Sequence, residues 1–180
     1  ENLKYLINLQ SLDLSENQIG TKGDTGTQVI GENLKYLINL QSLDLSQNWI
    51  DDYSDNGIIA IAESLRYLPQ LKTLDLSQII LAYYGDEGTQ AIGKSFLYLP
   101  QLQTLDLSQN GIGQLTDAGT QVIGENLQYL IGLQTLDLSG SYIGTTGDEG
   151  TQAIGKSLSY LTDLQTLDLS ENDIGLTADN

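Results

Sequence analysis

The tripeptide Leu-Asp-Leu recurs at a fixed interval along this chain. It begins at Leu12, Leu43, Leu74, Leu105, Leu136 and Leu167. Every step is 31 residues. A period of this length is typical of a solenoid, because a single repeat cannot bury its own apolar face and must stack on its neighbours. The sequence therefore predicts one hydrophobic core that runs along the whole array.

Each repeat has a strand-like half and a helix-like half. Leu12 and Leu14 alternate with polar residues, which is the period of a half-buried strand. Identical strands one repeat apart must lie parallel. The second half carries an apolar stripe of helical period that can pack against the strand layer. In the first full copy this stripe consists of Val29, Ile30, Leu34 and Leu37.

The first half of the unit, residues 9–19, follows the pattern L-x-x-L-x-L-x-x-N-x-I. It resembles the leucine-rich repeat, and the resemblance covers essentially all 180 residues. The second half, for example residues 85–96, is similar to the helical half of the ribonuclease-inhibitor-like class. The resemblance implies an α/β leucine-rich repeat solenoid, horseshoe-like, with parallel strands on the concave face and α-helices on the convex face.

Two features depart from the family pattern. The period is longer than the ~20 to 29 residues usual for leucine-rich repeats. The asparagine column fails at Ile79 and Ser141.

The repeat register never breaks, so residues 1–180 are predicted to form a single array of about six strands and five full 31-residue repeats. The chain opens inside a helical half and stops before another should begin. Solenoids normally close their ends with atypical polar repeats. We therefore expect this segment to be a fragment without caps.

Composition excludes several classes of function. The chain has no Cys and no His, so it has no disulfide framework, thiol nucleophile or imidazole ligand. A net charge of -17 disfavours nucleic acid and anionic membranes as partners. No membrane-spanning segment and no cofactor site are predicted. The sequence does not determine the cellular compartment. A composition with few Lys and many Gln, Thr and Ser favours an extracellular or cell-surface protein.

The exposed strand face carries an aspartate on every repeat, and these residues form a predicted concave-face ladder. The ladder consists of Asp13, Asp44, Asp75, Asp106, Asp137 and Asp168. Adjacent strands lie ~4.8 Å apart. Repulsion between neighbouring carboxylates is then on the order of 3 kcal/mol at an effective dielectric near 20. Hydroxyl hydrogen bonds, water, a raised pKa, cations or a basic partner must relieve it.

Aromatic and apolar side chains break the repeat in the strand-to-helix loops. Large apolar side chains in an expected solvent loop are candidate partner contacts, because aromatics dominate binding hot spots. The alternative is that the loops bury them locally. The predicted partner-binding residues are Trp49, Tyr53, Ile80, Tyr83, Tyr84 and Tyr142. Repeat three, with its run from Ile79 to Tyr84, deviates most.

Asp52 to Glu63 fits the spacing of an EF-hand calcium loop. The register argues against calcium, because the segment after Asp55 aligns with the helical half of the other repeats. No metal ligands are assigned. The equivalent aspartates, among them Asp55 and Asp117, are predicted to cap the helices that follow them.

Glycine recurs inside the predicted helices, where it costs ~1 kcal/mol relative to Ala. We expect close approach of adjacent helices to be the reason. The column contains Gly31, Gly93, Gly124 and Gly155.

Catalysis needs unlike groups converging in a pocket, whereas this chain offers like groups in rows, so it is predicted not to be an enzyme. The family resemblance implies a scaffold for protein–protein interaction. The alternative is a structural protein that assembles from copies of itself into a fibre or surface lattice through stacking and edge contacts. The unvarying Asp and Ser columns favour this alternative modestly.

Overall fold

The computed structural model describes residues 2–20, 25–50, 54–82 and 85–175. One parallel sheet contains six short strands in the order of the chain. They are β1 (Ser11–Asp13), β2 (Ser42–Asp44), β3 (Thr73–Asp75), β4 (Thr104–Asp106), β5 (Thr135–Asp137) and β6 (Thr166–Asp168). The predicted parallel sheet is confirmed.

Helices occupy the second half of the repeats, as the apolar stripe predicts. They are α1 (Thr25–Leu34), α2 (Asn56–Leu65), α3 (Glu87–Ser95), α4 (Ala118–Leu127) and α5 (Glu149–Leu158). Two 3-10 turns, η1 (Leu3–Tyr5) and η2 (Phe96–Tyr98), complete the described elements.

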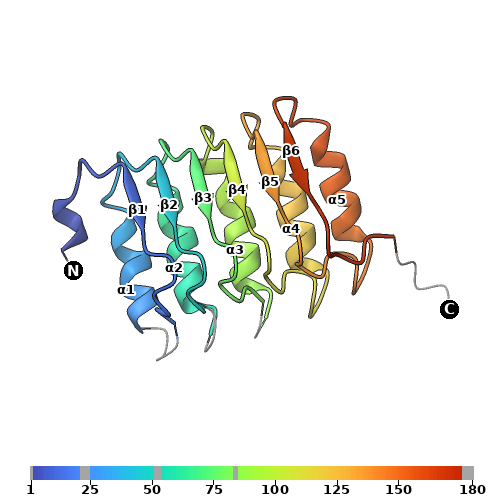
Figure 1. The fold of residues 1–180 in the computed structure, drawn as a ribbon, viewed down its shortest axis with the longest axis horizontal. Helices are drawn as coiled ribbons and strands as arrows, with labels where there is room; N and C mark the ends of the chain where they lie inside the picture. The colour runs from blue at the N-terminus through green and yellow to red at the C-terminus, as the bar shows by residue number, and fades with distance from the viewer. Residues whose placement is uncertain (1, 21–24, 51–53, 83–84, 176–180) are drawn as a thin grey trace.

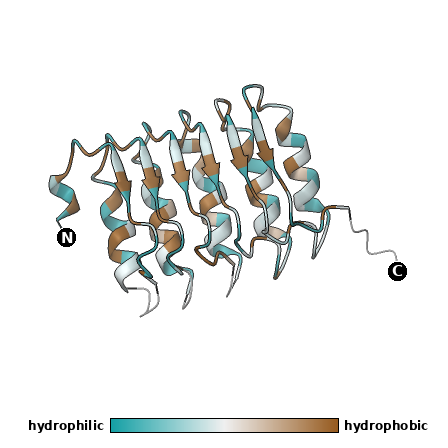
Figure 2. Ribbon diagram, in the orientation of Figure 1, coloured by the Kyte–Doolittle hydropathy of each residue, from teal (hydrophilic) through white to brown (hydrophobic). Residues whose placement is uncertain are grey.

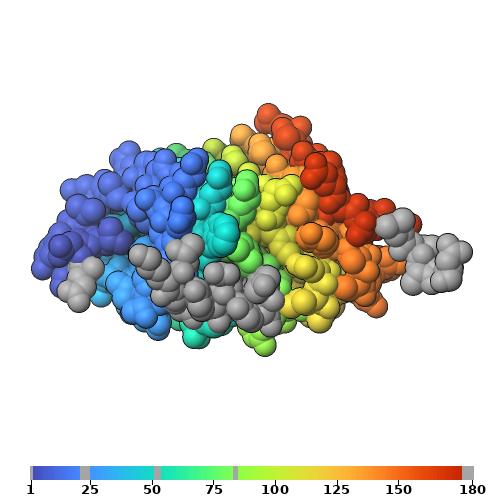
Figure 3. Space-filling model, turned by 60° about the horizontal axis from the view of Figure 1, so that its bottom comes forward, coloured from blue at the N-terminus to red at the C-terminus, as the bar shows by residue number. Residues whose placement is uncertain are grey.

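The strands form one layer and the helices a second layer behind it, as Figure 1 shows. In Figure 3 the repeats follow one another as slabs along the long axis. Packed helices need about 8–10 Å each, whereas strands need only ~4.8 Å. The strand layer is therefore the inner, concave face of the stack.

Strand pairing keeps the sequence period, so each leucine of the tripeptide faces its counterpart 31 residues away. Leu43 pairs with Leu74, and Leu105 with Leu136, and all four are fully buried. Figure 2 shows the resulting apolar band at the same level of every strand. Full burial of such a side chain contributes roughly 1.5–3 kcal/mol. Stacking the repeats thus supplies the core that a single repeat lacks.

The asparagine column links successive repeats through buried hydrogen bonds. Asn110 is 2% exposed, and its Oδ1 accepts the backbone N–H groups of Ile79 (3.1 Å) and Leu81 (3.3 Å) of the preceding repeat. Its Nδ2 donates to the carbonyl oxygens of Leu76 (2.8 Å) and Leu107 (3.0 Å). One side chain therefore pairs four backbone groups at the turn that leaves the sheet.

The two departures in this column have different consequences. Ser141 keeps part of the hydrogen bonding between repeats, because its Oγ donates to the carbonyl oxygen of Leu107 at 3.1 Å. Ile79 has no polar side-chain atom and is fully buried in the core instead.

The prediction that each aspartate caps its own helix is wrong. Asp55 stands at the N-cap of α2 but makes no side-chain cap bond there. Its Oδ2 accepts the backbone N–H of Gly88, in the first turn of α3, at 3.0 Å. Asp117 likewise accepts the N–H of Gly150 in α5 at 2.7 Å. The carboxylates thus satisfy the helix start of the following repeat and tie the repeats together.

The segment that matches an EF-hand loop continues into a helix, as the repeat register predicts. Residues from Asn56 onwards form α2, and Glu63 lies exposed on that helix. A helix cannot wrap its side chains around one ion as a calcium loop does. Asp52 lies outside the described residues.

Helix glycines mark close contacts between neighbouring helices, as expected. A Cβ added to Gly124 would lie 2.6 Å from the backbone nitrogen of Ile154, and one on Gly31 would lie 2.7 Å from that of Ile61. Gly155 differs, because a Cβ there meets no atom within 4 Å.

This contrast gives a matched pair of variants. We expect Gly124→Ala to lower the free energy of unfolding by about 1–3 kcal/mol, because the helices must separate. Gly155→Ala should raise it by up to about 1 kcal/mol, because alanine is the better helix former and meets no neighbour. Urea unfolding of the 180-residue chain measures both. Equal losses from the two substitutions would contradict this packing.

The asparagine column gives a second test. Asn110→Ala leaves buried backbone groups unpaired, at about 1–3 kcal/mol for each group. We expect a total loss of at least about 3 kcal/mol in urea unfolding. Asn17→Ala is the control, because Asn17 occupies the same column but is exposed, and should cost clearly less.

Candidate functional site

The aspartate ladder lies in register across the strand face, where each aspartate ends its strand. In all six repeats the aspartate Oδ1 accepts the backbone N–H of the serine two residues later at 2.9 Å. Serine hydroxyls add bonds of 2.6 to 2.8 Å at Asp13, Asp44, Asp75 and Asp168. Local hydrogen bonds therefore fix the carboxylates and offset part of their repulsion.

The ladder differs electrostatically between its ends and its middle. Hydrogen bonds from the Ser15 hydroxyl and amide lower the pKa of Asp13, and those from Ser170 lower the pKa of Asp168. Asp106 lies in the middle of the array. Burial raises the pKa of Asp106, and the charges of Asp75 and Asp137 add to this effect. The repulsion that the spacing predicts therefore contributes to the raised pKa of Asp106.

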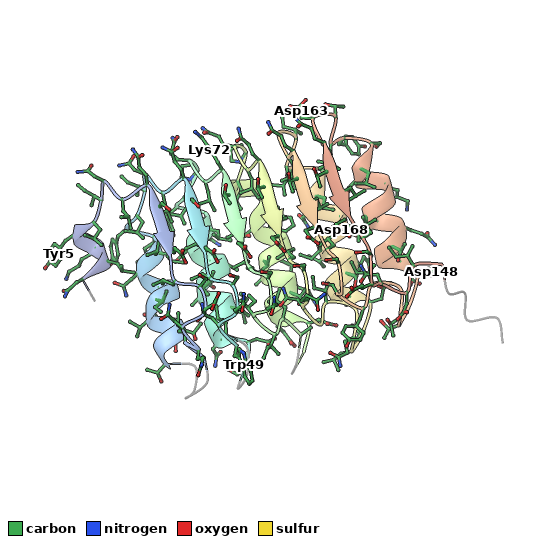
Figure 4. The ribbon with its side chains drawn as sticks, in the orientation of Figure 1. Tyr5, Trp49, Lys72, Asp148, Asp163 and Asp168 are labelled. Carbon is green, nitrogen blue, oxygen red and sulfur yellow. The ribbon has the colours of Figure 1, made fainter. Side chains whose placement is uncertain are left out.

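A groove lies beyond the carboxyl ends of the first strands. Its volume is about 460 Å³. Two columns of side chains line it, one of which comes just before the asparagine column and one just after. The lining residues are Glu16, Gln18, Gln47, Trp49, Gln78, Ile80 and Gln109. Figure 4 places Trp49 at this lower edge of the molecule.

All the residues that line this groove have left-handed backbone conformations. Their φ values are 57° for Glu16, 54° for Gln18, 55° for Gln47, 51° for Trp49, 53° for Gln78, 66° for Ile80 and 55° for Gln109. Residues other than glycine adopt this region rarely, and a bulky or β-branched one even more so. The conformation brings alternate residues to the same side of the turn.

Neighbouring repeats hold these backbones in place. The amide N–H of Gly20 donates to the carbonyl oxygen of Asn48 at 3.0 Å, and a side chain at Gly20 would overlap the Trp49 carbonyl. A side chain at Gly113 would likewise overlap the Tyr142 carbonyl. Glycine is therefore required in the repeat before each of these aromatic residues.

The predicted partner-binding residues divide into three groups. Trp49 is 51% exposed and Tyr142 is 48% exposed. Ile80 is only partly buried and lines the groove. Tyr53, Tyr83 and Tyr84 lie outside the described residues.

Three of the four described residues in the deviant apolar run of repeat three face the core. Ile79, Leu81 and Ala82 are fully buried, so the local-burial alternative holds for these three residues. Leu81 takes the core position that isoleucine holds in other repeats, for example Ile50 and Ile112.

Sequence reasoning missed the glutamine column. Glu16, Gln47, Gln78 and Gln109 are spaced by the repeat period, so the signal was present. It was hidden because each residue alone looks like an ordinary polar turn residue.

The opposite edge of the molecule carries exposed tyrosines, and basic side chains lie beside some of these rings. Lys4 lies 5.2 Å from the centre of the Tyr5 ring, and Arg66 lies 5.4 Å from that of Tyr98. Lys72 marks this edge in Figure 4. Tyr129, 49% exposed, belongs to the same edge and matches Trp49 in exposure.

Within the described ranges, no group of three or more acidic, His or Cys side chains could hold a metal ion. No helix in that part of the chain is long and apolar enough to cross a membrane.

The stacked strand–helix units, in-register leucines and bridging asparagines define a solenoid repeat protein. A profile of the leucine-rich repeat family matches residues 5–23, 36–62, 98–119 and 160–177. The chain is a leucine-rich repeat protein of the ribonuclease-inhibitor-like type, with strand–helix repeats of 31 residues. A search of the curated proteins found no match.

The Asp106 environment predicts a pH dependence. The raised pKa means that the folded protein holds this proton more tightly than the unfolded chain does. The corresponding stability is present below the unfolded pKa and is lost as the pH rises through the folded pKa. Asp106→Asn removes the titration and keeps an oxygen for the Ser108 amide. We expect the variant to gain stability relative to the parent between about pH 3 and pH 7.

Asp13→Asn is the control with the opposite sign. Because the pKa of Asp13 is lowered in the folded state, its contribution is present above the unfolded pKa and is lost as the pH falls. This variant should lose stability relative to the parent as the pH rises over the same interval. Chemical unfolding at each pH measures both differences, and parallel profiles for the two variants would contradict the assignment.

Proposed function

We propose that this chain is a non-enzymatic scaffold that binds a protein partner across its strand face and the edge around Trp49. Leucine-rich repeat domains generally serve as protein-interaction scaffolds. The observation that carries the proposal is the exposure of Trp49 and Tyr142, two large aromatic side chains in left-handed conformations. Such side chains gain little from packing where they stand, and binding is a reason for their presence.

The aspartate ladder gives the partner a preferred charge. In each repeat the carboxylate accepts a local hydrogen bond at Oδ1 from the following serine. Burial is the main cause of the raised pKa of Asp106, and Lys or Arg side chains of a partner would relieve the repulsion from Asp75 and Asp137 that adds to it. The partner is therefore a protein with a basic surface, and its association should weaken as salt is added.

A catalytic role has little support from these residues. The strand face repeats the same Asp and Ser in each unit, whereas a reaction needs different groups around one substrate. The repetition of Asp and Ser is also what supports the alternative proposal, which is assembly into a fibre or surface lattice.

Paired aromatic substitutions test the binding proposal. The variant Trp49→Ala with Tyr142→Ala should lower partner affinity by roughly 30-fold or more, since a central aromatic contact contributes about 2 kcal/mol or more. The control is Tyr129→Ala with Tyr160→Ala on the opposite edge. Partners captured from the source extract are identified, purified and titrated against each variant by calorimetry.

Light scattering of the purified chain separates the two proposals. A mass that stays at 19.6 kDa over a range of concentrations supports the scaffold. A mass that grows with concentration, and returns to the monomer in the Trp49 and Tyr142 double variant, supports self-assembly instead.

A further inference from the structure

We propose that the groove beside Trp49 binds a neutral glycan chain of extended, β-1,4-linked hexopyranose rings. This inference goes beyond the proposed function, because it assigns a second class of ligand, a neutral glycan, to the Trp49 edge of the same binding surface. It rests on the chemistry, the spacing and the charge of the residues that line the groove.

The lining combines amides with one indole ring. Gln47, Gln78 and Gln109 each present a group that both donates and accepts hydrogen bonds, and Glu16 adds an acceptor. Sugar hydroxyls also donate and accept, so they pair with either half of an amide. Trp49 offers an aromatic face, on which the C–H face of a pyranose ring can pack. The lining thus suits a ligand that is uncharged, rich in hydroxyls and flat on one side.

The spacing of the column fits a polymer with a short repeat. Beyond the ends of the strands the parallel hydrogen bonding continues, with Gln47 N–H donating to the Ser77 carbonyl and Gln78 N–H to the Ser108 carbonyl, both at 3.0 Å. The amide column therefore keeps the strand spacing of ~4.8 Å. The rise per ring of an extended β-1,4-linked chain is close to this value. One ring can then face each repeat.

An extended peptide fits this spacing less well. Its side chains and amides point to the same side only at every second residue, or about 6.6–6.8 Å. A peptide lying along the groove would lose register with the glutamines after one or two repeats.

The groove has a defined end on the side of the fifth repeat. There the column contains Gly140, and the Gln109 side chain reaches over it to donate from Nε2 to Glu171 at 3.2 Å. The open part of the column thus runs from Glu16 to Gln109. Affinity should rise with chain length until the rings span these repeats and then level off.

Charge excludes acidic glycans. In the described part of the chain no Lys or Arg lines this groove. Asp44 and Asp75 stand three residues before Gln47 and Gln78 in a chain of net charge -17. A uronic acid or sulfated chain would be repelled, so the ligand is not an acidic glycan.

The direct test uses the fluorescence of Trp49, which is the only tryptophan of the chain. Cello-oligosaccharides of two to six rings, malto-oligosaccharides of equal length and oligogalacturonates are titrated into the full 180-residue protein. We expect cellohexaose to shift the emission saturably, and maltohexaose and the oligogalacturonate to bind at least about tenfold more weakly. No saturable response to cellohexaose, or equal affinity for the three chains, overturns the proposal.

Variants connect the response to the groove. Calorimetry with cellohexaose should show a loss of about tenfold or more for Trp49→Ala and about fivefold for Gln78→Ala, the loss expected from one hydrogen bond. Tyr129→Ala and Gln101→Ala are the exposed controls on the opposite edge and should bind as the parent does. Unchanged affinity in Gln78→Ala and Trp49→Ala overturns the site.

A neutral capped hexapeptide separates this inference from the proposed function. If the peptide binds more tightly than cellohexaose, the groove is a peptide site and the glycan assignment is wrong. If protein-partner capture depends on Trp49 while no glycan binds, the scaffold proposal stands and only the ligand class fails. If cellohexaose binds and no protein partner is captured, the glycan assignment stands and the scaffold proposal fails.

Discussion

In-register parallel stacking is the constraint on which the rest of this structure depends. Every strand is set against its neighbour at a step of 31 residues, and no other register would bury the leucines. The asparagines fix this register, because Asn110 accepts hydrogen bonds from the preceding repeat and donates to carbonyl groups on both sides of the repeat boundary. Asp55 and Asp117 reinforce it from the helix side by pairing with the next helix start. Stability in this molecule therefore lies largely between repeats.

The same stacking forces like groups together on the surface. Because the sheet is parallel and in register, any column of the sequence becomes a row of side chains at the strand spacing. In the aspartate row, ionisation of Asp106 is disfavoured, because burial and two charged neighbours act together there. The glutamine row bears no such cost, since amides are neutral and can hydrogen bond along the row. A periodic surface of this kind suits extended or repetitive ligands.

Much of the fold could be predicted from the sequence, and parts of the candidate site could not. The strand, the helical stripe and the helix glycines follow from local pattern, and the structure confirms them at Leu43, Ile61 and Gly124. The capping of α3 by Asp55 could not be predicted, because the donor is 33 residues away and competes with the nearer helix start. The groove was missed since its two columns lie on either side of the asparagine column and meet only through the left-handed turn.

The sequence by itself determined the period, the strand and helix halves, and the identity of every surface row, because a fixed repeat allows one way of stacking that buries its leucines. Tertiary structure alone decided which departures from the repeat face solvent. Ile79 and Leu81 are buried while Trp49 and Tyr142 are exposed, although all four break or border the pattern in similar loops. The reason is the direction of each Cα–Cβ bond in the alternating left-handed turn. That direction depends on contacts with the preceding repeat, such as the one between Gly20 and Trp49.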